Sequence, residues 1–503
     1  MIPQHLFLYR HLEHSALEHP EHVAVQDGAG RLTYAALRAE AVAIAHRLEA
    51  EGVHPGDRVV LFLENSVDFA RAFWGAIYAG AVVTPLNVET KAAKLGYILG
   101  DCTPAAVIAD PAFVDEVYVA LPGEVDAAVI TLPALGTGDG SGPAPCAGRI
   151  IDQDLGCMIY TSGSTGQPKG VMLSHQNLVT ASRSVCAYLG YTSEDRIFVT
   201  IPLTFDYGMH QLTMAALIGA TVIIERSFAS PLFTLDRLVK SGATCFPVVP
   251  TMVPLIAALA DRFDFSSIRL ISSTAAALHP RVIDQLQDIF SNATIFSMYG
   301  LTECHRCTFL PPDQLARRKG SVGIAIPNTE MWVEDNDGKR HYRDATGVLV
   351  IRGATVMKGY WNRPDETAKR LQPGKFPGEF VLNTGDLCRL DADGYLYFIA
   401  RSDDVLKIRG EKVAPKEVED ALLLHPAASE AVVFGRPDKV QGHHLHALVT
   451  LRPGMTPTPQ ELREWCAQHL ESIAVPRRVE IRESFARNAN GKIDRSALID
   501  EAV

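Results

Sequence analysis

The sequence predicts an α/β protein with a large N-terminal domain of parallel, helix-covered sheets and a strand-rich subdomain, followed by a small α+β C-terminal domain. Three observations predict this fold class. The chain has 503 residues, which is too long for one ordinary core and indicates two or more domains. Short apolar runs alternate with amphipathic segments from residue 33 to residue 300. The pattern becomes strand-rich at residues 347–400 and mixed in the last hundred residues.

The segments before residue 161 alternate between helical and strand patterns. Residues 33–52 carry apolar side chains at helical spacing and end at a glycine, which predicts a helix. Short buried strands are expected at 57–63, 81–86, 105–110 and 156–160. Residues 135–148 are rich in Gly, Pro and Ser, so we expect a surface loop or linker there.

The alternation continues after residue 173 and is typical of parallel sheets covered by helices. Helices are expected at 174–189, 210–220, 235–242, 253–260 and 282–290, and strands at 196–203, 221–225, 244–250, 268–273 and 294–300. Two further strands are expected at 347–353 and 394–400. The small C-terminal unit is expected to contain helices at 415–424 and 459–470 and strands at 430–435, 445–451 and 478–483.

Composition and charge exclude several classes of protein. The net charge of −11 argues against a nucleic-acid footprint and against strong attraction to anionic lipid. We find no apolar run of bilayer length and no signal peptide at the start, so we expect a soluble, cytoplasmic protein. The nine cysteines cannot all pair within one chain, which fits a reducing compartment.

Two short motifs could bind a metal, but plainer interpretations are favoured. Cys304 and Cys307 form a single CxxC, and no second CxxC completes a four-cysteine zinc site. His443, His444 and His446 form a histidine-rich stretch of a kind that is more often polar surface.

Residues 160–170, "YTSGSTGQPKG", predict a phosphate-binding loop between a buried strand and a capped helix. Small residues let backbone N–H groups, hydroxyls and a helix N-terminus approach an anion, and Lys169 adds a positive charge. The stretch does not match the NTPase P-loop, because Pro168 precedes the lysine and Gly170 follows it. The alternative is a flexible Ser/Gly loop.

Further motifs connect this loop to a known family. They are "YTSGSTGQPKGVMLSH" (160–175), "YGLTE" (299–303), "NTGDL" (383–387), "RSDDVLKIRGEKVAPKEVE" (401–419) and "NGKIDR" (490–495). In this order, and over nearly the whole chain, they resemble the adenylate-forming superfamily of acyl-CoA synthetases, nonribosomal-peptide adenylation domains and beetle luciferases. The resemblance implies that a carboxylic acid attacks ATP to give an acyl-adenylate, which a phosphopantetheine thiol then converts to a thioester.

The resemblance also implies where ATP binds. The loop residues that would hold the phosphates are Thr161, Ser162, Gly163, Ser164, Thr165, Gly166 and Lys169. Tyr299 would flank the adenine, and Thr302 would lie on the phosphate side. Asp386 would accept hydrogen bonds from the ribose hydroxyls, and Arg401 would donate to the sugar or the phosphate. Alternatively, these last two residues form a solvated ion pair.

Four residues are expected to be catalytic by the same resemblance: Lys492, Glu303, Lys169 and Thr165. Glu303 would position Mg²⁺ on the phosphates, because a carboxylate oxygen suits that ion. Lys492 would bridge the attacking carboxylate and the α-phosphate, and its alternative is a lysine in a surface turn.

The domain organisation implied by the family is an adenylation core at residues 1–402 and a mobile domain at 403–503, with a hinge at Asp403. Gly410 would line the tunnel for the thiol. The family often has glycines where this chain has Ala400, Thr274 and Ala275.

The acid pocket is expected to include Phe205, Asp206 and Arg306. Phe205 resembles the aromatic residue that gates the pocket. Asp206 lies where relatives that activate amino acids keep an aspartate for the ammonium group, although it could simply cap the following helix. Arg306 could bind a second carboxylate of the substrate, or it could pair with a protein acid or a phosphate. Cys304 and Cys307 are expected to fill the pocket wall.

The acceptor thiol is left open by the sequence. The chain ends at residue 503 without a carrier module, so we expect a stand-alone ligase. Asp206 favours a small amino acid that is loaded on a separate carrier protein. The alternative is an acyl-CoA ligase for a fatty or aryl acid that uses free coenzyme A. An NTPase of the phosphohydrolase type and a catalytically inactive family member are more distant alternatives.

Overall fold

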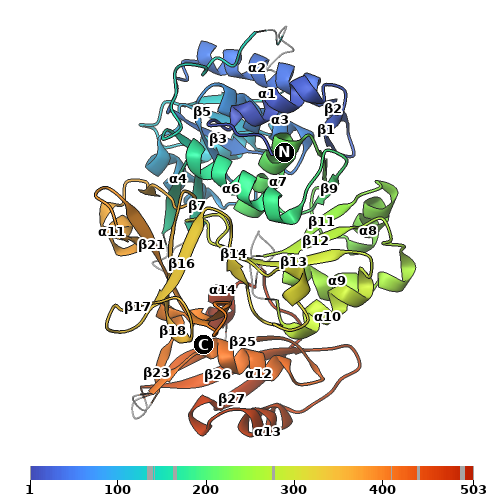
Figure 1. Cartoon of the computed structure of the whole chain (residues 1–503), viewed down its shortest axis with the longest axis vertical. Coiled ribbons are helices and arrows are strands. Elements are labelled where there is room, and N and C mark those ends of the chain that lie inside the picture. Colours follow the sequence, from blue (N-terminus) through green and yellow to red (C-terminus); the bar gives the residue numbers. More distant parts are fainter. Residues whose placement is uncertain are drawn as a thin grey trace. The chain divides into compact units, whose positions relative to one another are not determined.

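The computed structural model describes residues 2–132, 140, 142–162, 167–274, 278–408, 411–438, 442–487 and 493–501 (Figure 1). The chain divides into two compact units. The first contains Met1–Met331 and Ile351–Asn383, and the second contains Trp332–Val350 and Thr384–Val503. Asp403, the predicted hinge, lies within the second unit, and its role in domain motion stays a prediction.

One sheet of the first unit has the strand order β19-β8-β7-β4-β3-β5-β6. Its strands are β3 (Arg58–Phe62), β4 (Val82–Pro85), β5 (Ala106–Ala109), β6 (Ala128–Ile130), β7 (Leu155–Ser162), β8 (Pro168–Ser174) and β19 (Gly359–Tyr360). β3 pairs in parallel with both β4 and β5. Because helices cover both faces of such a sheet, its strands are continuous apolar runs, and the four buried strands predicted before residue 161 are confirmed.

The glycine-rich loop does not connect a strand to a helix, so this part of the prediction is wrong. It lies between the antiparallel strands β7 and β8, in which Thr161 pairs with Lys169 and Ser162 with Pro168. The strand after the loop was not recognised because proline and glycine are depleted in strands. α6 begins only after β8, and Ser174 and Asn177 form a capping box at its N-terminus.

The other sheet of the first unit has the order β15-β14-β13-β12-β11-β9-β10-β1-β2. Its strands are β1 (Val23–Gln26), β2 (Arg31–Thr33), β9 (Arg196–Val199), β10 (Thr221–Ile224), β11 (Cys245–Val248), β12 (Leu270–Ser273), β13 (Thr294–Tyr299), β14 (Thr308–Phe309) and β15 (Ile324–Ala325). The strands from β9 to β13 pair in parallel, which confirms the prediction from strand–helix alternation.

Helices cover these sheets and fill the space between them. They are α1 (Tyr9–Glu18), α2 (Tyr34–Ala50), α3 (Val67–Tyr78), α4 (Ala92–Cys102), α5 (Val114–Ala120), α6 (His175–Leu189), α7 (Asp206–Ile218), α8 (Pro231–Lys240), α9 (Val253–Ala257), α10 (Pro280–Ile289) and α11 (Pro364–Arg370). α6 packs on β7 and β8, α7 packs on β9 and β10, and the two helices pack on each other. They therefore form the layer between the two sheets (Figure 1).

The second unit combines strand-rich and α+β parts, as predicted. It contains all or part of β16 (Thr329–Glu334), β17 (Arg340–His341), β18 (Ala345–Gly353), β21 (Phe380–Leu390), β22 (Leu396–Arg401), β23 (Leu406–Ile408), β24 (Glu411–Val413), α12 (Pro415–Leu423), β25 (Ala428–Asp438), β26 (Gly442–Leu451), α13 (Pro459–His469), β27 (Arg478–Arg482) and α14 (Arg495–Glu501), while β20 (Leu371–Pro373) belongs to the first unit. β25, β26 and β27 form a sheet whose apolar side chains pack with those of α12 and α13.

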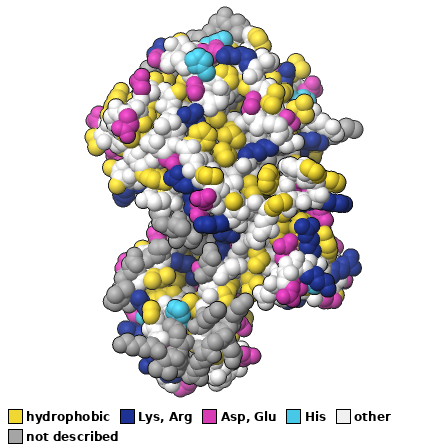
Figure 2. Space-filling model, turned by 90° about the vertical axis from the view of Figure 1, so that its left-hand side faces the viewer, with side chains coloured by type: hydrophobic (Ala, Val, Ile, Leu, Met, Phe, Trp, Pro, Cys, Tyr) yellow, Lys and Arg dark blue, Asp and Glu magenta, His cyan; other side chains and the backbone are white. Residues whose placement is uncertain are grey.

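Helix length and surface charge bear on the expected partners. None of the helices in the described ranges has both the length and the apolarity needed to cross a bilayer. On the face drawn in Figure 2, acidic and basic side chains are interspersed. That face therefore offers no continuous basic surface to a nucleic acid.

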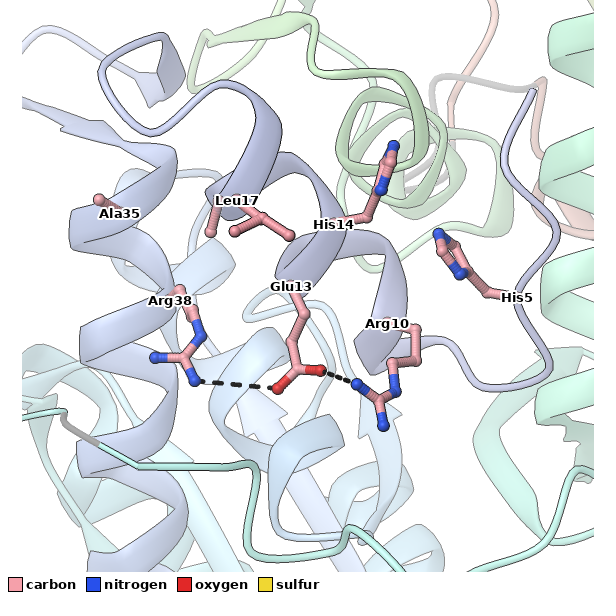
Figure 3. Close-up of a pocket in the computed structure, with 8 residues that line it drawn as sticks. His5, Arg10, Glu13, His14, Leu17, Ala35 and Arg38 are labelled. Carbon is pink, nitrogen blue, oxygen red and sulfur yellow. Dashed lines mark hydrogen bonds and ion pairs between the residues drawn. The ribbon is translucent and has the colours of Figure 1, made fainter. Parts of the chain in front are cut away.

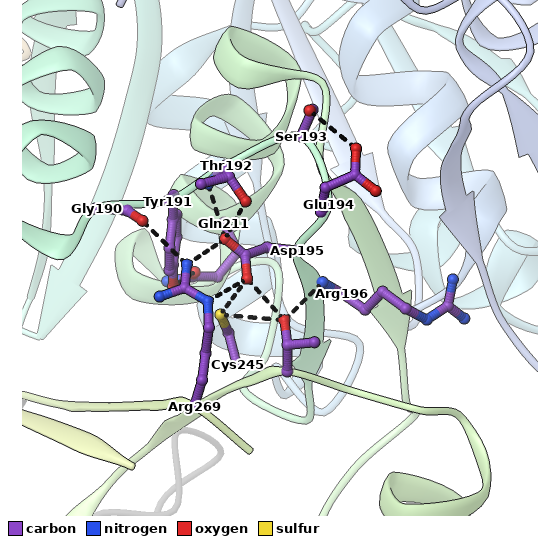
Figure 4. A network of polar contacts seen from close by, with 11 residues as sticks. Gly190, Tyr191, Thr192, Ser193, Glu194, Asp195, Arg196, Gln211, Cys245 and Arg269 are labelled. Carbon is purple, nitrogen blue, oxygen red and sulfur yellow. Dashed lines mark hydrogen bonds and ion pairs between the residues drawn. The ribbon is translucent and has the colours of Figure 1, made fainter. Parts of the chain in front are cut away.

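The buried carboxylate of Asp195 connects the amino-terminal ends of three parallel strands through hydrogen bonds (Figure 4). Asp195, just before β9, accepts hydrogen bonds from Arg269 Nε at 2.7 Å, Thr244 Oγ1 at 2.8 Å and the Thr192 backbone N–H at 2.7 Å. Thr244 and Arg269 immediately precede β11 and β12. Burial by itself would raise the pKa of Asp195, but these hydrogen bonds outweigh it and hold the pKa below the usual 3.8.

We expect Asp195→Asn to destabilise the first unit by about 2–3 kcal/mol at pH 7, because a charged acceptor is lost while the Arg269 side chain, 42% exposed, regains water. A carboxyl whose pKa is lowered by folding stabilises the protein above its unfolded pKa. The gap between the melting temperatures of wild type and variant should therefore be largest at neutral pH and shrink as the pH falls below 3.8. Asp236→Asn, in an exposed pair with Lys240, is the matched control. Equal melting temperatures for wild type and Asp195→Asn at pH 7 would contradict this account.

Candidate active site

Three of the motif segments follow the carboxyl ends of parallel strands in one sheet. Phe205 and Asp206 come after β9, Thr274 comes directly after β12, and residues 299–306 begin at the end of β13. The order β13-β12-β11-β9 places these ends along a single edge of the sheet. Ligands of open α/β sheets bind outside the carboxyl ends of the strands. This edge is therefore the candidate active site of the first unit.

The segment after β13 is a tight loop that folds back on itself. A Cβ added to Gly300 would lie 2.1 Å from the carbonyl oxygen of His305, so only glycine fits there. His305 has a left-handed backbone with φ of 55°. The backbone N–H of Cys307 donates to the Tyr299 carbonyl at 2.9 Å and closes the loop. Thr302 and Glu303 lie in the turn of this loop, where the predicted nucleotide contacts were expected.

Tyr360 connects the glutamate of this loop with the lysine of the glycine-rich segment. Its hydroxyl donates to Glu303 Oε1 at 2.7 Å. The ammonium group of Lys169 lies 5.5 Å from the centre of its ring, within the range of a cation–π interaction. β19, which carries Tyr360, pairs with β8, which carries Lys169. Tyr360 thereby contacts both a cation and a carboxylate, which come from two motifs far apart in the sequence.

Lys169 also has an acidic partner. Its Nζ donates to Glu366 Oε2 on α11 at 2.5 Å. Hydrogen bonds from Lys169 and then from Lys369 lower the pKa of Glu366 to about 2. The lysine is therefore held beside the glycine-rich segment by a carboxylate, an anion that a phosphate oxygen can replace.

Asp206 and Arg306 are brought together at the same sheet edge. Asp206 is the first residue of α7, and its Oδ1 accepts from the backbone N–H of Tyr207 at 2.8 Å. The N-cap position is held by Phe205, so Asp206 is not the capping residue. Asp206 Oδ2 lies 3.8 Å from Arg306 Nη1, and the two side chains are 4% and 3% exposed. The two residues form a buried ion pair.

Asp386 and Arg401 are neighbours in the second unit. They face each other on the antiparallel strands β21 and β22, and Arg401 Nε lies 2.8 Å from Asp386 Oδ1. Asp386 is 1% exposed, whereas the Arg401 side chain is 43% exposed. The pair predicted at the strand ends therefore exists, with its carboxylate buried instead of solvated. Burial of such an acid is compatible with a binding role or with a structural one.

Several predicted site residues lie outside the described residues. They are Gly163, Ser164, Thr165, Gly166, Gly410 and Lys492, together with Ala275 among the departures from the family pattern. Ser162 and Asp403 are described by their backbone only, in β7 and in a short 3-10 turn. Tyr299 ends β13, and Thr161 lies in β7. Their contacts with a nucleotide stay predictions.

All nine cysteines of the chain are free and buried. Burial raises the pKa of Cys102 and of Cys146 to about 12. Cys304 and Cys307 approach each other with 2.9 Å between their sulfur atoms. Their hydrogen bond, together with burial, raises the pKa of Cys304 well above that of an ordinary thiol.

A depression of about 800 Å³ lies against α1 (Figure 3). Within it, Glu13 forms ion pairs with Arg10 at 2.7 Å and with Arg38 at 3.9 Å. These three charged side chains are thus already paired with one another. None of the residues that line the depression belongs to a predicted site, so we do not place the active site there.

Tyr360 was missed by the reasoning from sequence. A lone tyrosine in "MKGYWNRP" carries no chemical pattern, and its importance comes from pairing of β19 with a strand far away in the sequence. His210, which stacks on His305 with 5.3 Å between ring centres, was also missed. It lies in the middle of an apolar helix, where a histidine is more often a core residue.

Comparisons with known proteins identify the family to which this chain belongs. The family model "AMP-binding enzyme" matches residues 12–361, and "AMP-binding enzyme C-terminal domain" matches residues 417–492. Oxalate–CoA ligase of Arabidopsis thaliana is 30% identical over 96% of this chain and 96% of its own length. One of the linear gramicidin synthase proteins of Brevibacillus parabrevis is 29% identical over 99% of this chain, which corresponds to 10% of that protein. The crystal structure of ATP-bound MatB from Rhodopseudomonas palustris has a TM-score of 0.90, 28% identity and 99% coverage of both chains. The chain therefore belongs to the AMP-binding enzyme family and is an AMP-forming acid–thiol ligase of the adenylate-forming superfamily.

Proposed function

We propose that the chain activates a carboxylic acid with ATP as an acyl-adenylate and then transfers the acyl group to the thiol of coenzyme A. The arrangement of Lys169, Tyr360 and Glu303 carries this proposal. Adenylation joins two anions, so it needs positive charge beside the phosphates and a carboxylate for their metal ion. In the first unit, Lys169 provides the positive charge and Glu303 provides the carboxylate, and both side chains contact Tyr360.

The residues present fit ATP with Mg²⁺. Oε1 of Glu303 accepts from Tyr360, and no donor among the described residues contacts Oε2, which leaves a hard oxygen ligand available. Mg²⁺ on the phosphates would neutralise part of their charge and favour attack by the acid. Lys169 would exchange its bond to Glu366 for one to a phosphate oxygen. Tyr360 would hold both side chains in place.

The remaining predicted roles are part of the same proposal. The loop residues Thr161 to Gly166 would bind the phosphates, Tyr299 and Thr302 the adenine and phosphate sides, and Asp386 and Arg401 the ribose. Lys492 would bring positive charge to the attacking carboxylate. Asp403 would act as the hinge of a mobile C-terminal domain, and Gly410 would line the thiol tunnel. The interval between the two family matches, residues 362–416, contains the proposed hinge and supports this division.

The acceptor that we favour is free coenzyme A. Oxalate–CoA ligase corresponds to this chain over 96% of both lengths, whereas the gramicidin synthase protein extends far beyond the matched part. The expectation from sequence, a separate carrier protein loaded with a small amino acid, rests on Asp206. That carboxylate already lies 3.8 Å from the guanidinium of Arg306, and a substrate ammonium placed there would be repelled by a like charge. We therefore propose an acid without a free amine.

The test is ATP–pyrophosphate exchange over a panel of amino acids, monocarboxylic acids and dicarboxylic acids. Each acid that supports exchange is then incubated with ATP and either coenzyme A or a phosphopantetheinylated carrier protein. We expect AMP release and a CoA thioester. A thioester found on the carrier but not on coenzyme A would overturn the choice of acceptor, and exchange restricted to amino acids would restore the role predicted for Asp206. ADP instead of AMP as product would overturn the proposed function.

A further inference from the structure

Arg306 is a buried cation, and two of its nitrogen atoms have no hydrogen-bond partner among the described residues. Its Nη1 donates to the backbone carbonyl of His305 at 2.8 Å and lies 3.8 Å from Asp206. Its Nε and Nη2 are buried, and no acceptor in the described part of the chain contacts them. These two groups form the edge of the guanidinium that binds a carboxylate with two parallel hydrogen bonds. The edge without a partner in the described part of the chain is thus the one suited to a two-oxygen anion.

The contacts on the other sides hold this guanidinium in one place. The ring of Tyr207 lies 4.7 Å from its central carbon, and the Tyr207 hydroxyl is fixed in turn by Ser272. The Nη1 contacts come from the tight loop after β13 and from the start of α7. The guanidinium is therefore held on one face and along one edge. Its remaining edge can bind a ligand without a further loss of side-chain entropy.

Two buried imidazoles lie beside it. The ring of His305 stacks on that of His210, with 5.3 Å between the ring centres. Neither ring nitrogen of His305 has a hydrogen-bond partner among the described residues, and the same is true of His210 Nδ1. An imidazole N–H group can donate a hydrogen bond to an anion. Three buried side chains in one small region therefore have polar groups that no described residue satisfies.

We propose that Arg306 binds a second carboxylate of the substrate, so that the acid activated by this enzyme is a dicarboxylate. This inference rests on the proposed function and names its substrate class. Arg306 is close enough to the proposed adenylation site to bind the same acid. It lies three residues after Glu303 in the same loop, so the two Cα atoms are roughly 11 Å apart at most. One carboxylate of the acid would be adenylated while the other remains on the guanidinium.

Other substrate classes fit these groups less well. A fatty or aryl acid would leave the Nε and Nη2 donors buried and unpaired, which weakens its binding. An ammonium would face the guanidinium at close range. A carboxylate satisfies both donors at once and adds the stronger, charge-assisted kind of hydrogen bond.

The first arm of the test compares the unmodified enzyme on matched pairs of acids. Straight-chain dicarboxylates of two to six carbons are set against their monomethyl esters and against monocarboxylates of equal length, in ATP–pyrophosphate exchange. We expect kcat/KM for the best dicarboxylate to exceed that of its monoester at least about 100-fold, since a site built to pair a charged group strongly rejects analogues that lack it. A preference for the monoesters or monocarboxylates overturns the inference but leaves the proposed function intact. Absence of exchange with every acid overturns the proposed function instead.

The second arm uses Arg306→Met and Arg306→Lys, with the exposed Arg262→Lys as the control. We expect Arg306→Met to abolish the preference for the dicarboxylate, measured as the ratio of its kcat/KM to that of the monoester, and Arg306→Lys to retain part of this preference. If neither variant folds, as judged by melting temperature, the comparison of acids on the unmodified enzyme still decides. A preference that survives in a folded Arg306→Met variant overturns the assignment.

Discussion

Glu303→Gln is expected to lower kcat/KM for ATP–pyrophosphate exchange about 100-fold or more. A glutamine keeps the size of the side chain and can still accept from Tyr360 through its carbonyl oxygen, so the fold of the loop should be preserved. What is lost is the negative charge that a hard metal ion requires, and stabilisation by such an ion amounts to several kcal/mol. The measurement is the exchange rate as a function of Mg²⁺ concentration, which should show a higher half-saturating concentration in the variant.

Two further variants make this prediction specific. Tyr360→Phe keeps the ring beside Lys169 but removes the donor to Glu303, so we expect a smaller loss of about tenfold, equivalent to one hydrogen bond to a charged group. Asp236→Asn removes an exposed carboxylate of α8 and should leave the rate unchanged. If Glu303→Gln shows the rate and Mg²⁺ dependence of the unmodified enzyme, Glu303 is not the metal ligand.

Lys492→Ala is expected to separate the two half-reactions. Adenylation should fall by about 100- to 1,000-fold, as when one pre-organised charge is removed from a transition state. Thioester formation from a chemically prepared acyl-adenylate and coenzyme A should change less than about threefold, because the proposed hinge motion at Asp403 would take Lys492 away from the reacting atoms before that step. Single-turnover measurements of each half-reaction test this difference.

The matched control for this variant is Lys240→Ala, which removes an exposed lysine of α8 and should affect neither half-reaction. A Lys492→Ala enzyme that loses both half-reactions equally would contradict the assigned role and indicate a general structural one. Equal rates of adenylation in the variant and the unmodified enzyme would leave the lysine as part of a surface turn.

Much of the fold could be predicted from local pattern because the sheets are mainly parallel. Strands buried on both faces are continuous apolar runs, and β3, β4 and β5 were recognised for this reason. Strand β8 was not, since Pro168 and Gly170 resemble a turn and its pairing with β7 is a property of the folded chain. The order of strands within each sheet was also inaccessible, because it depends on where each crossover returns.

The candidate site shows the same limit. Glu303 and Lys169 could be identified from motifs. That both contact Tyr360 could not, because Tyr360 lies on an edge strand from a distant part of the sequence. Asp206 could be identified as a candidate, yet its interpretation changes once Arg306 is found beside it. Residue type and spacing indicate which groups can do chemistry, and only the packed structure says which of them already have partners.

Because its nine cysteines are buried, the enzyme is protected from acylation by the acyl-adenylate that it forms. An acyl-adenylate reacts with any accessible thiolate, and a ligase that exposed such a group would acylate itself. Here each sulfur is enclosed, and burial raises the pKa of even Cys466 to about 11, so its thiolate is scarce at neutral pH. The protein thereby reserves its activated acyl groups for the thiol that enters from outside.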